Sequence, residues 1–309
     1  MYDVVIIGGG PAGMSCGLYA SRAGMKTIVV EKMFSGGQMS TTNEVENYPG
    51  VENVISGAEL AYKFEGQARK FGVEFLNADV SGVQLDGPVK KIVTGQETLE
   101  TKTVVFAMGT VARKLGLEDE VRLTGKGVSY CATCDGAFFR GKDVAVIGGG
   151  DTALEDALFL SRICNKVYLV HRRNEFRGTK VLQDQVLQTE NIEVCYQMVT
   201  EKILGDNTVN GLILRHVGDA TQRQLDVNGV FVAVGSDPSN QLVQELLDLS
   251  PEGYILTDDT MQTSVPGVYA AGDIREKQLR QIITAASDGA IAGFNAALYV
   301  NTQSQESEE

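Results

Sequence analysis

The sequence predicts an α/β fold with two domains that share one plan. An apolar segment over Tyr2–Ile7 leads into the glycine-rich loop Gly8–Gly13, and a helix-forming segment follows. A second apolar segment, Asp143–Ile147, leads into Gly148–Ala153 and another helix-forming segment. A G-x-G-x-x-G/A loop between a buried strand and a helix is typical of a Rossmann-like βαβ unit. We therefore expect two dinucleotide-binding domains with parallel sheets.

The spacing inside the two copies supports the same prediction. Glu31 closes the second strand of the first copy and follows Gly8 by 23 residues, and His171 follows Gly148 by the same 23. An equal interval at both places indicates two units of one architecture. The expected bounds are a helix to Ala23 and a strand over Thr27–Val30 in the first copy, and a helix to about Ile163 and a strand over Val167–Val170 in the second.

The remaining segments complete the two domains. Turn signals predict a hairpin in each copy, and an apolar strand then runs into glycine. The turns are Asp86-Gly87-Pro88 and Gly205-Asp206-Asn207, and the strands are Thr103–Ala107 and Gly229–Val234. Gly267–Asp273 and a helix over about Thr284–Val300 follow without a third glycine loop. The simplest layout inserts the second domain, 114–241, into the first, 1–113 with 242–309, with a disordered acidic tail from about 302.

Composition limits the classes of function. The 309 residues carry a net charge of −13, which argues against nucleic acid or an anionic membrane as a partner. No apolar run approaches the roughly 18 residues of a membrane-spanning helix. The N-terminal strand leads straight into a glycine loop and leaves no basic targeting segment. We expect a cytoplasmic protein.

The residues that close the second strands indicate different dinucleotides. The Glu31 carboxylate is placed to accept hydrogen bonds from ribose hydroxyls and would repel a 2′-phosphate, so the first site suits FAD or NAD. His171-Arg172-Arg173, with Arg177, offers cations at the corresponding position. Guanidinium groups bind phosphate bidentately, so the second site should prefer NADPH to NADH. Asp151, beside the second loop, is expected to cap the helix that starts there.

The pair Cys131 and Cys134 is the cysteine spacing that suits joint chemistry. The other three of the five cysteines, Cys16, Cys164 and Cys195, lie in apolar surroundings and are expected in the core. Zinc ligation, two unrelated structural thiols and a redox dithiol are the alternatives for the CxxC pair. The dithiol is favoured because the spacing closes a small disulfide loop and further zinc ligands are scarce in the sequence. Asp135 is the nearest candidate proton donor, or a helix N-cap or turn residue.

These motifs together resemble the low-molecular-weight, bacterial-type thioredoxin reductases over essentially the whole chain. The matching segments are Gly8–Gly13, Gly36-Gly37-Gln38, Glu44–Gly50, Cys131–Asp135, Gly148–Ala153, His171-Arg172-Arg173 with Arg177, and Gly272-Asp273 with Arg280-Gln281. Small departures are Met108-Gly109-Thr110, where many relatives have threonine before glycine, and the unmatched acidic tail.

The resemblance implies a site for each cofactor. FAD would lie on the first domain, and the residues expected to contact it are Gly8, Gly10, Pro11, Ala12, Gly13, Glu31, Lys32, Gly37, Gln38, Asn47, Gly109, Gly272, Asp273, Arg280, Gln281 and Ile282. NADPH would lie on the inserted domain, and the residues expected to contact it are Gly148, Gly150, Asp151, Thr152, His171, Arg172, Arg173 and Arg177.

The resemblance also implies a mechanism. Electrons would pass from NADPH to FAD, then to the Cys131–Cys134 disulfide, then to thioredoxin. Cys134 would face the flavin and form the charge-transfer thiolate, Cys131 would attack the partner's disulfide, and Asp135 would donate the proton. The dithiol and the NADPH loop share one domain, so that domain is expected to swing about hinges near Val111–Leu115 and Pro238–Gln241. The family is typically homodimeric.

Three alternatives for the function stay open at this point. The same chemistry could serve another redoxin or a peroxidase-linked carrier, because partner choice depends on surface patches. Some related flavoproteins take electrons from ferredoxin, but they lack the cationic cluster that this sequence has. The third alternative is a flavin-binding redox sensor without turnover.

Overall fold

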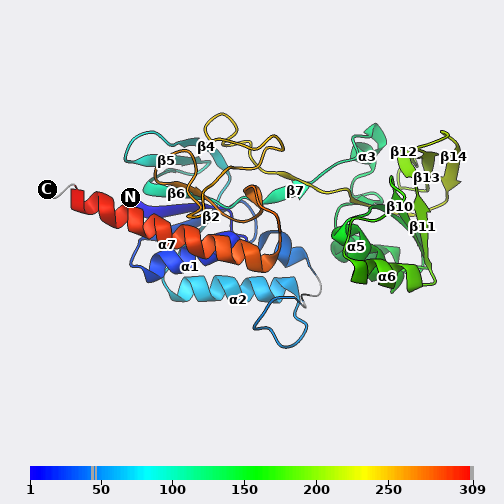
Figure 1. Ribbon diagram of the computed structural model, residues 1–309, viewed down its shortest axis with the longest axis horizontal. Coiled ribbons are helices and arrows are strands. Elements are labelled where there is room, and N and C mark those ends of the chain that lie inside the picture. The colour runs from blue at the N-terminus through cyan, green and yellow to red at the C-terminus, as the bar shows by residue number, and fades with distance from the viewer. Residues whose placement is uncertain (43–44, 46, 307–309) are drawn as a thin grey trace. The chain divides into compact units, whose positions relative to one another are not determined.

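The chain folds into two compact units, Met1–Val111 with Asp237–Glu309, and Ala112–Ser236 (Figure 1). The computed structural model describes residues 1–42, 45 and 47–306, with the backbone alone for 304–306. The chain passes between the units at β7 (Thr110–Ala112) and β16 (Ser236–Pro238), and these two strands pair. The boundaries expected from the sequence, 113/114 and 241/242, lie a few residues further along the chain.

The first unit contains a mixed sheet and three long helices. Its strands are β1 (Tyr2–Ile7), β2 (Thr27–Glu31), β3 (Glu74–Asn77), β4 (Val80–Gln84), β5 (Lys90–Thr94), β6 (Thr98–Phe106) and β17 (Val268–Ala270). Its helices are α1 (Pro11–Arg22), α2 (Gly57–Lys70) and α7 (Ile282–Glu306), with 3₁₀ turns η1 (Gly37–Thr41) and η3 (Gly272–Ile274). The sheet order is β3-β2-β1-β6-β5-β4, with β17 also paired to β6.

The first glycine loop lies where the strand order reverses. β1 pairs in parallel with β2 on one side and β6 on the other, so the chain leaves β1 at a switch point. Open parallel sheets bind ligands at the carboxyl ends of strands at such a point. The topology therefore places Gly8–Gly13 where a dinucleotide is expected.

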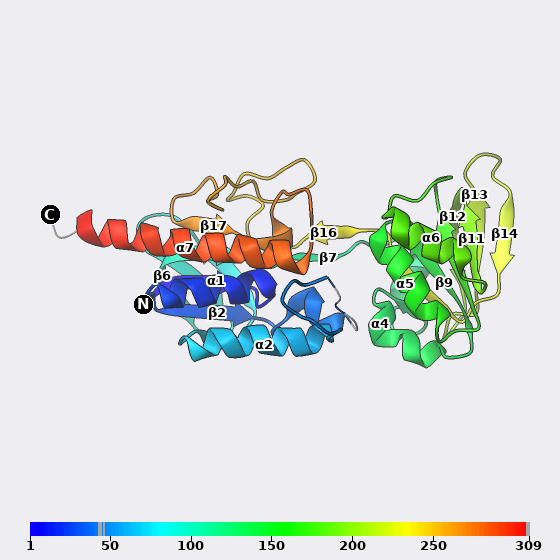
Figure 2. The same cartoon turned by 60° about the horizontal axis from the view of Figure 1, so that its bottom comes forward.

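Alternate residues of these strands fill two separate cores. Val4 and Ile6 of β1 pack with α1 and α7, whereas Val5 and Ile7 pack on the opposite face. The helices α7 and α1 lie side by side over the sheet (Figure 2). They approach closely through Gly289, where an added Cβ would collide with the backbone of α1. Burial of both faces explains why the central residues of β1 and β2, 4–7 and 28–30, are all apolar.

The second unit repeats the plan with a smaller set of elements. Its strands are β8 (Val128–Ser129), β9 (Asp143–Gly148), β10 (Lys166–His171), β11 (Ile192–Tyr196), β12 (Met198–Leu204), β13 (Gly211–His216), β14 (Gln222–Leu225) and β15 (Gly229–Ala233). Its helices are α3 (Glu118–Leu123), α4 (Ala132–Asp135), α5 (Asp151–Ser161) and α6 (Lys180–Gln188), with a 3₁₀ turn η2 (Gly136–Phe139).

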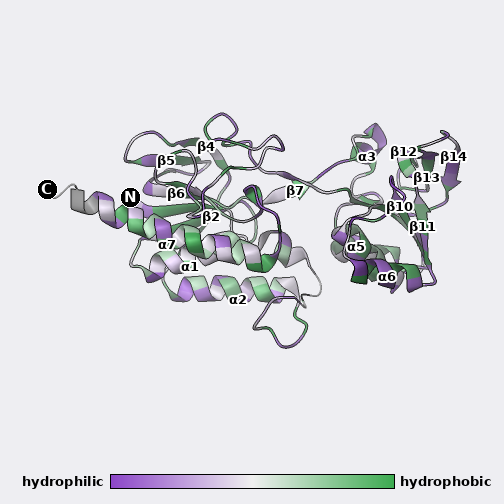
Figure 3. Ribbon diagram, in the orientation of Figure 1, coloured by the Kyte–Doolittle hydropathy of each residue, from purple (hydrophilic) through white to green (hydrophobic). Residues whose placement is uncertain are grey.

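The five-stranded parallel sheet of this unit has the order β11-β10-β9-β15-β8. One face packs against α5 and α6, and the other packs against the antiparallel strands β12, β13 and β14. β14 is largely hydrophilic in Figure 3, because its first three residues are Gln222, Arg223 and Gln224; all three are exposed, and Leu225 is buried. The second glycine loop follows β9, which lies between β10 and β15, so it also occupies a switch point.

Most of the expected elements are confirmed. Both hairpin turns lie between paired antiparallel strands, β4 with β5 and β12 with β13. The predicted end of the C-terminal helix is wrong, because α7 continues to Glu306 rather than stopping near Val300. The expectation of disorder from about 302 is therefore wrong through Glu306, and residues 307–309 lie outside the described part.

The isolated cysteines are core residues, as expected. Cys16, Cys164 and Cys195 are buried free thiols in three different apolar clusters. Burial raises the pKa of the Cys164 thiol to about 11. Within the described residues, no helix is long and apolar enough to cross a membrane.

Candidate active site and nucleotide-binding loops

The first glycine loop leaves the start of α1 open. Gly8 has a φ of 109° and lies against the carbonyl of Ala107, so a side chain there would collide with backbone. Gly10 is the N-cap of α1, and a Cβ on it would meet no described atom within 4 Å. Unpaired N–H groups at an open helix start bind phosphate. The loop therefore fits the pyrophosphate of a dinucleotide.

The middle glycine of each loop packs on the residue that closes the second strand. Gly9 N–H donates to Glu31 Oε2 at 2.7 Å, and a Cβ on Gly9 would crowd the Glu31 side chain. In the second copy, a Cβ on Gly149 would collide with the His171 ring. The interval of 23 residues thus corresponds to the same contact in both units.

His171 differs from the cation that the sequence predicted. Its side chain is buried, and Nε2 lies 3.0 Å from the carbonyl oxygen of Glu175. Burial lowers the pKa of His171, and the charges of Arg177 and Arg173 lower it further. Burial and the two neighbouring arginines therefore disfavour the charged form of the His171 ring, so its place differs from that of the exposed arginines.

The positive charge of this cluster comes from three arginines. Arg172, Arg173 and Arg177 are exposed, and in the described part of the chain none of them pairs with a carboxylate. Unpaired guanidinium groups beside a glycine loop fit a 2′-phosphate. The arginine part of the predicted site therefore has the right charge and exposure.

Asp151 does not cap α5. The N-cap is Gly150, and the Asp151 carboxylate instead accepts a hydrogen bond from the Thr179 N–H at 2.6 Å. The predicted capping role is wrong because the carboxylate turns toward the segment that carries Arg177. Thr152 follows in the first turn of α5.

The C-terminal part of the chain returns to the first loop. Gly272 has a φ of 80°, and a Cβ on it would lie 2.8 Å from that of Ala12. Beside it, Asp273 Oδ1 is buried and has no hydrogen-bond partner among the described residues. Burial raises the pKa of Asp273, while Lys277 and Arg280 oppose this shift. Lys277 Nζ lies 4.0 Å from this oxygen, so the acceptor has an ion-pair partner but no hydrogen-bond partner among the described residues, and it fits the hydroxyl groups of a bound cofactor.

Asp288 of α7 holds this returning segment in place, and the sequence did not single it out. Its carboxylate accepts from Gly272 N–H at 3.1 Å, Lys277 Nζ at 2.8 Å and Arg275 at 3.3 Å. The Asp288 and Lys277 side chains are only 10% and 7% exposed. Such a buried network fixes Gly272-Asp273 relative to α7.

Several other predicted contacts of the first site have partners within the first unit. Asn47 donates to Gln281 Oε1 at 3.0 Å across 234 residues of sequence, and Ile282 follows at the start of α7. Four further predicted positions have these neighbours: Gln38 donates to Thr110 at 2.8 Å, Gly37 lies against Gly10, Lys32 pairs with exposed Asp79, and Arg280 stacks on Tyr254. Glu44 and Glu46 of the matching motif lie outside the described residues.

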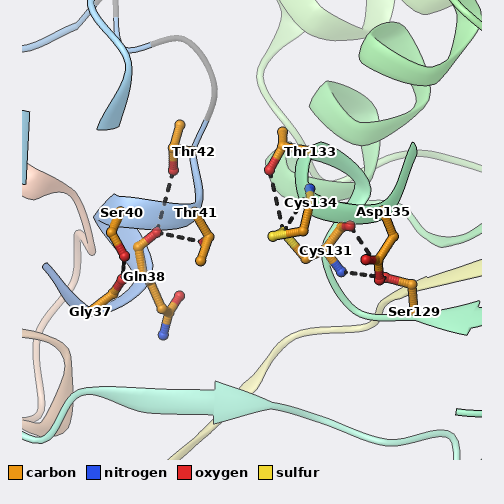
Figure 4. Close-up of a disulfide and its surroundings, with 10 residues drawn as sticks. All are labelled: Gly37, Gln38, Ser40, Thr41, Thr42, Ser129, Cys131, Thr133, Cys134 and Asp135. Atoms are coloured by element: carbon orange, nitrogen blue, oxygen red, sulfur yellow. Dashed lines mark hydrogen bonds between the residues drawn. A yellow bond between two sulfur atoms is a disulfide. The ribbon is translucent and has the colours of Figure 1, made fainter. Parts of the chain in front are cut away.

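Cys131 and Cys134 form a disulfide in the second unit (Figure 4). Cys131 is the N-cap of the short helix α4, and its Sγ accepts from the Cys134 N–H at 3.2 Å. The hydroxyl of Thr133 lies 3.3 Å from the same sulfur atom. These groups surround Cys131 Sγ with hydrogen-bonding partners.

Asp135 is held beside the disulfide by Ser129. The Ser129 hydroxyl donates to Asp135 Oδ2 at 2.6 Å, and the Cys131 N–H donates to the same hydroxyl oxygen at 3.0 Å (Figure 4). Sequence reasoning missed Ser129, although its place two residues before the CxxC pair was a usable signal. The serine therefore links the acid to the dithiol.

A buried carboxylate, Glu120, ties the start of the second unit to the dithiol segment. It accepts from the N–H groups of Leu115 and Gly116, both at 2.9 Å, and from the hydroxyl of Tyr130 at 2.8 Å. Burial and the Glu120 contact raise the pKa of Tyr130 to about 12. Tyr130 precedes Cys131, so one side chain holds both segments.

The predicted residues divide cleanly between the units. Those expected to contact the first dinucleotide lie in the first unit, and Cys131, Cys134 and Asp135 lie in the second unit with the second loop. The structure thus brings the dithiol and the arginine cluster into one folded body.

Comparisons with known proteins agree with this site. Residues 2–289 match the family described as pyridine nucleotide-disulphide oxidoreductase. The chain is 45% identical over 304 residues to the thioredoxin reductase of Mycolicibacterium smegmatis, covering 98% of both chains. It is also 45% identical to a bifunctional thioredoxin reductase/thioredoxin of Mycobacterium leprae, covering 96% of this chain and 65% of that one.

A solved structure extends the similarity to the fold. The crystal structure of Lactococcus lactis thioredoxin reductase superimposes with a TM-score of 0.94 at 41% identity, covering 98% of this chain and 100% of that one. Family model, full-length relatives and structure therefore agree with two nucleotide loops and a paired CxxC. The chain belongs to the pyridine nucleotide-disulphide oxidoreductase family, and within it to the thioredoxin reductases.

Proposed function

We propose that this protein is an NADPH-dependent thioredoxin-disulfide reductase that uses FAD. The observation that carries the proposal is the Cys131–Cys134 disulfide in the same unit as a glycine loop flanked by exposed arginines. When bound, NADPH would supply a hydride and FAD would supply the redox chemistry that links it to the disulfide. The overall change converts NADPH, a proton and a protein disulfide to NADP⁺ and a dithiol.

We assign FAD to the first unit. Gly10 leaves the start of α1 open to the pyrophosphate, and Glu31 keeps carboxylate oxygens close to the loop. Asp273 offers a buried acceptor, while Asn47 and Gln281 bring the two ends of the unit together. The assignment fits a dinucleotide without a 2′-phosphate, because a carboxylate would repel that group.

We assign NADPH to the second unit. Gly150 leaves the start of α5 open in the same way, and Arg172, Arg173 and Arg177 provide the positive charge. A 2′-phosphate carries about −1.5 to −2 charge at neutral pH. Three exposed guanidinium groups, which pair with no carboxylate among the described residues, favour it over the uncharged hydroxyl of NADH.

The chain's own sulfur atoms perform the exchange with the substrate. Reduction of the disulfide gives two thiols, and the Cys131 thiolate attacks the partner's disulfide to form a mixed disulfide. Cys134 then attacks Cys131 Sγ, releases the reduced partner and restores the starting bond. Asp135, held by Ser129, supplies the proton that the leaving thiolate needs.

The substrate is proposed to be thioredoxin. A relative that matches nearly all of this chain carries thioredoxin activity in the same polypeptide by its name. We also propose a homodimer and a cytoplasmic location, on the family resemblance and the composition of the chain. A ferredoxin-fed enzyme is disfavoured because the arginine cluster would then have no role.

We further propose that the second unit swings relative to the first during turnover. The dithiol and the NADPH loop belong to one unit, so both must reach the flavin in turn. The two strands at which the chain crosses between the units, β7 and β16, are the places where such a motion would bend.

Anaerobic reduction of the FAD-loaded enzyme tests the proposal. NADPH should bleach the flavin absorbance, and NADH should do so at least about tenfold less efficiently, because it lacks the group that the arginines bind. Cys134→Ser should still allow bleaching but abolish turnover with thioredoxin. Equal efficiency of NADH, or turnover by Cys134→Ser, would reject the proposal.

A further inference from the structure

The segment that carries the arginines is bonded directly to the second glycine loop. The N–H groups of Arg177 and Gly178 both donate to the carbonyl of Gly149, at 2.8 and 3.3 Å. The Thr179 N–H donates to Asp151 Oδ1 at 2.6 Å, and Gln183 donates to the Gly178 carbonyl at 2.7 Å. Backbone and side-chain hydrogen bonds therefore join the second glycine loop to the arginine segment.

Other contacts fix the earlier part of the same segment. The His171 ring contacts the Glu175 carbonyl, and Phe176 is buried with its ring centroid 5.7 Å from that of His171. The Gln197 N–H donates to the carbonyl of Arg173 at 3.1 Å. The backbone of the segment is thus held at several points, while the arginine side chains are exposed.

A carboxylate at the position of Asp151 needs an explanation. It lies in the first turn of α5, where its negative charge opposes a pyrophosphate bound at the same helix start. The contact that compensates is the charge-assisted bond from Thr179, whose neighbours carry the binding groups for the 2′-phosphate. The Asp151 carboxylate therefore weakens binding of the pyrophosphate and orders the segment that binds the 2′-phosphate.

We infer that Asp151 is a positioning residue for cofactor selectivity. Through Thr179 it holds Arg177 at the place where the 2′-phosphate of NADPH binds, and this inference rests on the proposed NADPH site. Its removal should affect the two nicotinamide cofactors in opposite directions. Both cofactors lose the repulsion between Asp151 and the pyrophosphate, but NADP⁺ alone also loses an organised arginine, and this loss should outweigh the gain.

Gly178 provides a second way to move the same segment. A Cβ on Gly178 would meet Leu154 Cδ1 at 2.5 Å and Asp151 Oδ1 at 3.1 Å. Gly178→Ala should therefore displace the arginine segment while it leaves the Asp151 charge in place. Comparison of Gly178→Ala with Asp151→Ala therefore separates the effect of the position of the arginine segment from the effect of the Asp151 charge.

Direct binding of NADP⁺ and NAD⁺, measured by calorimetry on the FAD-loaded protein, tests the inference. Asp151→Ala should weaken NADP⁺ binding by roughly tenfold, and NAD⁺ binding should stay equal or become tighter. Asp151→Asn keeps an acceptor oxygen and should retain most of the preference for NADP⁺. Gly178→Ala should weaken NADP⁺ binding and leave NAD⁺ binding within about twofold.

Asp184→Asn is the matched control, because this exposed carboxylate on α6 pairs with Lys180 and not with the arginine segment. It should leave both affinities unchanged. Equal weakening of NADP⁺ and NAD⁺ by Asp151→Ala, or an unchanged ratio of the two, overturns the inference alone. An unaltered protein that binds NADP⁺ no better than NAD⁺ overturns the NADPH assignment and the inference with it.

Discussion

Ser129 is the contact that holds Asp135 beside the disulfide. Ser129→Ala removes the hydroxyl that lies 2.6 Å from Asp135 Oδ2 and should let the acid turn away. We expect turnover with thioredoxin to fall by about tenfold, because a misplaced acid transfers its proton less well. The rate of flavin bleaching by NADPH should not change, since Ser129 does not belong to the nucleotide sites.

Ser129→Thr is the control for this prediction, because it keeps a hydroxyl on the same carbon atom. It should restore most of the turnover. Slower bleaching in Ser129→Ala, or an unaffected turnover, would show that the serine does not act through Asp135.

Asp156 on α5 makes the stability of the protein depend on pH. Burial, reinforced by the neighbouring Glu155, raises the pKa of Asp156 from its ordinary 3.8 to about 7. The folded protein then binds this proton more tightly than the unfolded chain, so the group destabilises the fold as pH rises from about 4 to 7. Below that range the effect vanishes.

Asp156→Asn removes this destabilisation, and the variant should be more stable than the parent above pH 7. Each pKa unit corresponds to about 1.4 kcal/mol, so a gain of a few kcal/mol is expected. Thermal unfolding at pH 5 and pH 8 should show a difference between the two proteins that widens with pH. Asp226→Asn, on an exposed carboxylate, should show no such widening.

At the scale of elements, α3 anchors the first segment of the second unit through Glu120. Glu120→Gln replaces one carboxylate oxygen that accepts backbone N–H groups with an NH₂ group that cannot, and leaves part-buried donors unpaired. We expect a loss of about 1–3 kcal/mol in local stability. Hydrogen exchange at Leu115 and Gly116 should accelerate accordingly.

Glu118→Gln is the matched control on the same helix, because Glu118 is exposed. The hydrogen-exchange rates of Leu115 and Gly116 in Glu118→Gln should equal those in the unaltered protein. Unchanged protection of Leu115 and Gly116 in Glu120→Gln would show that the carboxylate does not hold this segment.

The elements that could be predicted are those whose signal is local. The strand, loop and helix of each copy follow from apolar runs, glycines and the interval that ends at Glu31 or His171. The capping role of Asp151 was mispredicted, and the burial of His171 was missed, because their partners, Thr179 and Glu175, lie in an irregular segment whose path the sequence does not reveal. Asp288 was missed for a similar reason. It lies within α7 but accepts a hydrogen bond from Gly272, which belongs to the segment before that helix.

At the scale of the whole molecule, the proposed swing of the second unit can be measured directly. Dyes attached at Lys70→Cys in the first unit and Lys202→Cys in the second report the separation of the units by energy transfer. Both lysines are exposed, and the three free cysteines are buried. NADP⁺ should change the populations of the transfer efficiencies, because it favours one arrangement.

Labels placed at Lys70→Cys and Gln222→Cys should report the same change, because Gln222 belongs to the same unit as Lys202. A single transfer efficiency that changes neither on addition of NADP⁺ nor on chemical reduction of the disulfide would contradict the proposed motion of the second unit.

The contact between a middle glycine and the end of the second strand also has a practical meaning for protein engineering. The side chain at position 171 packs against Gly149, just as Glu31 packs against Gly9. This position therefore contributes to the structure of the loop as well as to recognition of the cofactor. Replacement of the arginines alone would remove the preference for NADPH without creating a preference for NADH. The first domain supplies the template for a redesign toward NADH: a carboxylate at 171 that accepts from the glycine N–H and faces the ribose.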